Sequence, residues 1–128
     1  MSTVKLVLLY QAAAMPLLPP GICKADALLV ELDDAIRHQD QELACALVHR
    51  YGQLDAAPRP LQDVLIKYAC SEEGSLHAEK FYRTATDEFA NTRSAFRWRQ
   101  MVALARVTAS ESGRPSAGYQ QACKLLNV

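Results

Sequence analysis

The side chains best suited to chemistry are concentrated between residues 74 and 83, a segment with a histidine, a glutamate, a lysine, a tyrosine and an arginine. On a helix, Glu79 and Arg83 lie one turn apart and can form an ion pair. His77 and Glu88 are eleven residues apart, close to three turns, so they share a face. This pattern predicts a polar pocket, suited to a small anionic ligand, between the fifth and sixth expected helices. The candidate lining residues are His77, Glu79, Lys80, Tyr82, Arg83, Glu88, Arg97, Arg99 and Arg106.

The three histidines, His38, His49 and His77, do not have the spacing of a metal site. Helical bundles that bind two metal ions supply a Glu-x-x-His pair from each of two helices. Here the glutamates that precede His38 and His49 are seven residues away, which is two helical turns and too far for both side chains to hold one ion. We therefore expect neither a metal site nor a cofactor.

The sequence does not support a nucleophilic catalytic centre any better than it supports a metal site. Cys70 and His77 are seven residues apart, about 10 Å along a continuous helix, and they would meet only if the chain folded back at Gly74. His77 is more simply explained as a histidine at a helix start, near Glu73. The sequence therefore names no catalytic residue and leaves open whether the chain is an enzyme.

A basic and aromatic stretch runs from Arg93 to Arg99, with Phe96 and Trp98 interleaved between arginines. Such residues can stack on bases while guanidinium groups hold phosphates, and they are equally typical of protein interfaces. In a third alternative, Trp98 packs in the core and the arginines pair with carboxylates. Zero net charge and the lack of a glycine-rich phosphate loop or known DNA-binding motif make nucleic acid the least favoured partner.

Arg106 lies in the run from Met101 to Ala109, which is apolar on nearly every side of a helix. Such a helix is expected to be central and buried, and a buried arginine must be paired. Glu79 and Glu88 are the expected partners. The sequence does not distinguish a closed, structural ion pair from the wall of a pocket.

These side chains are expected to be positioned by helices, because apolar residues recur with helical spacing along most of the chain. The expected helices cover residues 2–14, 25–38, 41–54, 61–70, 75–91, 95–111 and 116–126. The second and third form an antiparallel hairpin over 25–54, with Asp40 as the N-cap between them. The sequence thus predicts an all-α fold, a single compact bundle of six or seven helices with more than about 60% helix.

The 128 residues fit one domain, on which residues 1–21, an N-terminal segment and a Pro-rich connector, are expected to pack. The net charge is zero but unevenly divided. Residues 1–79 contain six Lys and Arg against eleven Asp and Glu, and residues 80–128 contain eight against three. The halves, about −5 and +5, either neutralise each other on packing or leave a basic face for an anionic partner.

The four cysteines, Cys23, Cys45, Cys70 and Cys123, are widely spaced and form no Cys-x-x-Cys pair, so we expect four free thiols in a reducing compartment. The apolar start of the chain is short and broken by polar residues, which favours part of the fold over a signal peptide. No apolar run reaches the length of a membrane span. These features predict a cytoplasmic protein without a membrane partner.

The function that these features favour is a small helical binding or assembly module without catalytic chemistry that we can name. We expect a homo-oligomer or a protein partner, because Val4–Leu9 and the Leu17–Pro20 stretch would expose apolar surface in a monomer. The first alternative is an enzyme or ligand-binding protein that uses the polar pocket. The second is nucleic-acid binding through the Arg93–Arg99 stretch.

Overall fold

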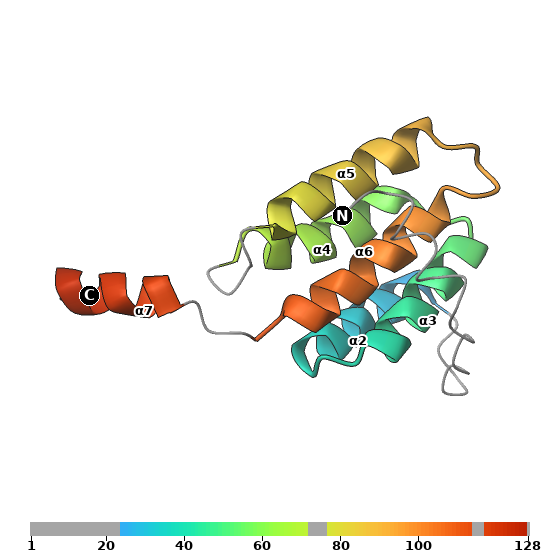
Figure 1. The fold of residues 1–128 in the computed structure, drawn as a ribbon. Coiled ribbons are helices and arrows are strands. Elements are labelled where there is room, and N and C mark those ends of the chain that lie inside the picture. Colours follow the sequence, from blue (N-terminus) through green and yellow to red (C-terminus); the bar gives the residue numbers. More distant parts are fainter. Residues whose placement is uncertain (1–23, 72–76, 114–116, 128) are drawn as a thin grey trace.

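Figure 1 shows the computed structural model, which describes residues 24–71, 77–113 and 117–127. Within these ranges the regular structure is all helical, and 79% of the described residues lie in helices. The helices are α2 (Ala25–Arg37), α3 (Gln41–Gln53), α4 (Pro58–Ala69), α5 (Ala78–Asn91), α6 (Trp98–Glu111) and α7 (Ala117–Leu126). The predicted all-α bundle is confirmed. The helix expected over residues 2–14 and the Pro-rich connector lie outside the described residues.

The hairpin predicted from the sequence is formed by α2 and α3. Asp40 caps α3, and its carboxylate accepts a hydrogen bond of 3.0 Å from the backbone N–H of Leu43. Gln39 has a positive φ of 58°, a conformation that turns the chain sharply between the two helices. The buried residues that α2 contributes are Leu28, Leu32, Ala35 and Ile36, the stripe expected from helical spacing.

The central helix of the bundle is α6, as the sequence predicts. It packs most extensively on α3 and α5 and also touches α2 and α4. In Figure 1 it runs between α5 and α3. The continuous run from Gln100 to Ala105 is buried. The side-chain amide of Gln39 donates a hydrogen bond to the carbonyl of Ser112, which holds the end of α6 against the turn between α2 and α3.

Two helix starts differ from the sequence prediction. The sequence predicts a helix that starts at residue 61, but α4 begins at Pro58. Proline suits the first turn of a helix, because its φ is already helical and the N–H that it lacks has no partner there.

The second difference is at α6, which begins at Trp98 instead of near residue 95. Residues 94–97 form a turn, in which the backbone N–H groups of Phe96 and Arg97 both donate to the carbonyl of Arg93. Ser94 is part of this turn and therefore does not cap the helix.

Asp33 joins α2 to α4. Its carboxylate accepts hydrogen bonds from Lys67 Nζ at 2.9 Å and from the Tyr68 hydroxyl at 2.8 Å, and it lies 2.7 Å from the Arg37 guanidinium. Burial acts to raise the pKa of the Asp33 carboxyl, but these donors and positive charges outweigh it, so the pKa is lowered. The ionised carboxylate therefore stabilises the fold, and that stabilisation is lost as the pH falls through the lowered pKa.

None of the helices in the described ranges is long and apolar enough to cross a membrane.

Candidate binding surfaces

The predicted site residues on α5 differ in their exposure to solvent. Glu79, Lys80 and Arg83 are exposed, whereas Tyr82 is half-buried against the hydrophobic core. His77, at the N-cap position of α5, is exposed and makes no capping hydrogen bond with its side chain. The polar residues of this segment therefore face the solvent and not α6.

The expected ion pair between Arg106 and α5 is not found. Arg106 is half-buried, and no ion pair between described residues joins it to Glu79 or Glu88. Its positive charge acts on the thiol of Cys45, a residue of α3. The apolar run around Arg106 predicts that α6 is buried but does not determine which neighbouring helix each face meets.

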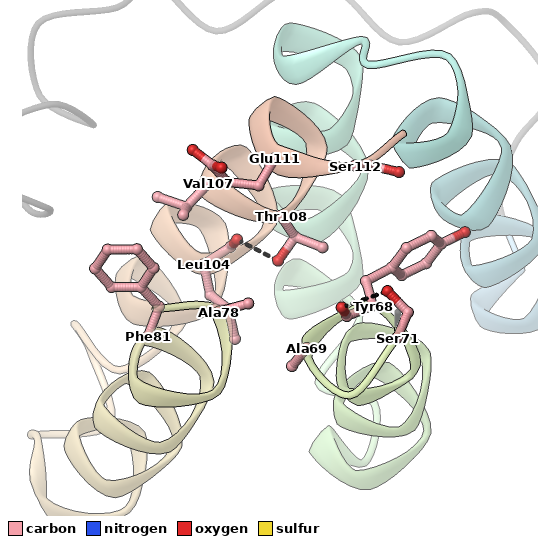
Figure 2. A pocket seen from close by; sticks show the side chains of 10 residues that line it. All are labelled: Tyr68, Ala69, Ser71, Ala78, Phe81, Leu104, Val107, Thr108, Glu111 and Ser112. Carbon is pink, nitrogen blue, oxygen red and sulfur yellow. Dashed lines mark hydrogen bonds between the residues drawn. The ribbon is translucent and has the colours of Figure 1, made fainter. Parts of the chain in front are cut away.

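A pocket of about 360 Å³, part of it open to solvent, lies where the end of α4, the start of α5 and the end of α6 meet. It is shown in Figure 2, with Leu104 and Thr108 of α6 between the side chains of α4 and α5. Its lining does not include any of the predicted site residues. The lining residues are Tyr68, Ala69, Ser71, Ala78, Phe81, Leu104, Val107, Thr108, Glu111 and Ser112.

Two of the hydroxyl groups that line this pocket already donate hydrogen bonds within the protein. The Thr108 hydroxyl donates to the Leu104 carbonyl at 2.8 Å, as Figure 2 shows, and the Ser71 hydroxyl donates to the Tyr68 carbonyl at 2.9 Å. Among the described lining residues, Glu111 is the only charged one, and it is negative. The described part of the lining therefore offers no positive charge to the small anionic ligand predicted from the sequence.

Trp98 belongs to an aromatic cluster at the junction of α3, α5 and α6. Its ring lies edge-on to Phe89, with centroids 5.0 Å apart, and to Tyr51, with centroids 5.8 Å apart. The backbone of Gly52 runs directly beneath the indole, so closely that a Cβ at residue 52 would lie 2.7 Å from two of its ring atoms. Trp98 is thus packed on the core and is not free to stack on a base.

The arginines beside Trp98 stack on phenylalanines. The Arg97 guanidinium lies 5.0 Å from the centre of the Phe89 ring, and the Arg99 guanidinium lies 4.8 Å from that of Phe96. Of the two aromatic residues that the sequence placed in a stacking surface, only Phe96 is exposed. The pairing of these arginines with carboxylates, also expected, is not seen between described residues.

The histidines are separated in the fold. His38 contacts Asp34 within its own turn, and His49 Nε2 lies 3.1 Å from the side-chain amide of Gln53. Within the described ranges, no three His, Cys, Asp or Glu side chains come together in a way that could hold a metal ion.

Cys45 is the most protected of the described cysteines, all three of which are free. It is 6% exposed, and its Sγ lies 3.8 Å from the Val102 carbonyl of α6. Burial raises the pKa of the Cys45 thiol to about 11, against a smaller opposing effect of the Arg106 charge. The thiolate, which is the reactive form, is therefore scarce at neutral pH.

We expect native protein at about pH 8 to be alkylated rapidly at the exposed Cys70 and only through unfolding at Cys45. Peptide mass spectrometry after timed exposure to iodoacetamide gives the two rates separately. A denatured sample is the control, in which both cysteines should react fully. Equal rates for the two thiols in the native protein would contradict the burial of Cys45.

The C-terminal helix α7 carries two of the five exposed large hydrophobic residues in the described part of the chain. Figure 1 shows it apart from the bundle, beyond the end of α6. Leu125 is 79% exposed and Leu126 is 72% exposed. The sequence predicts this helix and its apolar residues, but a stripe of leucines at helical spacing is equally typical of a helix buried in its own core. Its exposure is visible only in the structure.

The comparisons with known proteins do not identify a relative: no protein-family model, no curated protein and no solved structure matches this chain.

Proposed function

We propose that the chain is a small helical assembly module that forms a homo-oligomer, with α7 as its apolar contact element. The observation that carries this proposal is the exposure of Leu125 and Leu126 on a helix that stands apart from the bundle. Neighbouring apolar side chains exposed together are typical of interaction sites, whereas single exposed ones are ordinary.

The sequence of α7 supports an interface because the helix is amphipathic. Ala122, Leu125 and Leu126 share one side, and the opposite side is polar. The polar residues on that side are Gln120 and Lys124. The helix has only ten residues, and isolated helices shorter than about 12–15 residues are marginally stable in water. Burial of its apolar side on a second chain would stabilise it.

We also propose a cytoplasmic location. The described cysteines Cys45, Cys70 and Cys123 are all free, which fits a compartment that keeps thiols reduced.

The test is a variant with Leu125→Ser and Leu126→Ser. Light scattering over a concentration series should give the parent a mass above the 14.1 kDa of one chain, and should give the variant a lower mass than the parent at each concentration. The melting temperature of the bundle should hardly change, because α7 stands apart from it.

The matched control is Gln120→Ser with Lys124→Ser, which changes the polar side of the same helix and should leave the mass of the parent unchanged. A parent that is monomeric at every concentration, or a leucine variant that associates as strongly as the parent, would refute the proposal.

A further inference from the structure

The turn between α5 and α6 is strongly basic. No acidic residue occurs between Glu88 and Glu111, whereas Arg93, Arg97 and Arg99 fall within seven residues. We call residues 93–99 the arginine turn. Among described residues, none of its arginines forms an ion pair.

The arginine turn also has an apolar centre, because Phe96 is 44% exposed among these arginines. Arg99 stacks on its ring, which leaves the rest of the ring available to a partner. An apolar side chain ringed by cationic groups suits an acidic surface that has an apolar centre of its own.

The outer side of α2 has that complementary character. Asp26, Val30, Glu31 and Asp34 are exposed and lie on the side opposite the buried leucines. We call these four residues the acidic α2 face. Val30, at its centre, is 70% exposed. Arg37 lies on the same side of the helix, and its guanidinium is paired with Asp33 at 2.7 Å.

The carboxylates of the acidic α2 face form few ion pairs with other described residues. Among described residues, Asp26 and Glu31 form no ion pair, and Asp34 contacts only His38, at 3.4 Å. By contrast, Asp33 points toward α4 and binds Lys67 and Tyr68. The acidic α2 face is therefore available to a partner.

We propose that the acidic α2 face of one copy docks on the arginine turn of a second copy. Phe96 would pack against Val30, and Arg93 and Arg99 would pair with the carboxylates around it. The second copy is favoured as the partner because this one chain carries both surfaces, each with an unpaired charge of opposite sign around an exposed apolar residue. A two-fold arrangement would make the contact twice, once in each direction.

This contact uses residues distant in sequence from α7, so it is tested separately from the proposed function. All variants are made in the full chain with Leu125→Ser and Leu126→Ser, which removes the apolar contact of α7. One variant adds Asp26→Lys and Glu31→Lys to the acidic α2 face. The other adds Arg93→Glu and Arg99→Glu to the arginine turn. Arg97 is left in place because it packs on Phe89.

Sedimentation velocity at low salt should show weak self-association of the serine background, and each charge-reversed variant alone should associate about tenfold more weakly or not at all. An equal mixture of the two reversed variants should associate again, because each reversed surface then meets an opposite charge. High salt should weaken the association of the mixture. Circular dichroism of each variant verifies that it is folded.

The matched control carries Glu79→Lys and Lys80→Glu, which exchange two exposed charges on α5 and should leave association unchanged.

Failure of the mixture to associate overturns this inference. If the parent associates but the serine background does not, the α7 proposal stands and this inference fails. If the background associates as strongly as the parent and mixing restores association, this inference stands and the α7 proposal fails. Binding of a single-stranded oligonucleotide by the background, lost on Arg93→Glu and Arg99→Glu without any effect of mixing, assigns the turn to nucleic acid and also overturns this inference.

Discussion

A Leu47→Ala variant is expected to lose about 3 kcal/mol of unfolding free energy, the largest effect of any single substitution considered for this protein. Leu47 lies on α3 and is 1% exposed within the hydrophobic core. Truncation removes buried methyl groups and leaves a cavity that the neighbouring helices fill only in part. Urea denaturation followed by circular dichroism measures the loss directly.

The matched control for this experiment is Leu126→Ala, which removes the same atoms from a side chain that is 72% exposed. Its unfolding free energy should stay within about 0.5 kcal/mol of the parent. A Leu47→Ala variant as stable as this control would show that α3 does not pack in the core as described.

A Gly52→Ala variant should be destabilised by about 2 kcal/mol, although alanine is the better helix former. The added Cβ would lie 2.7 Å from two atoms of the Trp98 indole and 3.2 Å from its Cβ. The indole cannot withdraw easily, because it is packed against Phe89 and Tyr51. Relief of the overlap therefore requires α3 and α6 to separate slightly at this end.

Urea denaturation of Gly52→Ala is best compared with that of Gly118→Ala, because a Cβ at residue 118 would have no neighbour within 4 Å. The second substitution should be neutral for the bundle. Tryptophan fluorescence should also shift in Gly52→Ala alone, since Trp98 is the only tryptophan of the chain. Equal stability of the two variants would mean that Gly52 and Trp98 are not in close contact.

Most of the bundle could be predicted because the signals for its helices are contained in short stretches of sequence. The stripe in α2, the cap at Asp40 and the apolar run in α6 each depend on residues close in sequence. The start of α4 differs from the prediction for a local reason as well. Proline breaks a helix when it lies in the interior but is well suited to the first turn, where Pro58 lies.

The candidate site was harder to predict, because helical periodicity shows which residues share a face but not which helix that face meets. The pocket does lie beside α5 and α6, yet Ala78 and Phe81 line it while Glu79 and Lys80 between them point to solvent. In the same way, Arg106 forms no ion pair with the described carboxylates of α5. Such pairings depend on contacts between distant residues, and no local pattern encodes them.

The central position of α6 has a consequence for how the bundle comes apart. Every other helix from α2 to α5 packs on it, so none of them keeps a complete core when α6 is displaced. The smallest unit that can open around the buried run of Gln100–Ala105 is therefore the whole bundle. Amide protons in that run should exchange with solvent only through global unfolding, whereas α7 can lose its helical hydrogen bonds while the rest of the molecule stays folded.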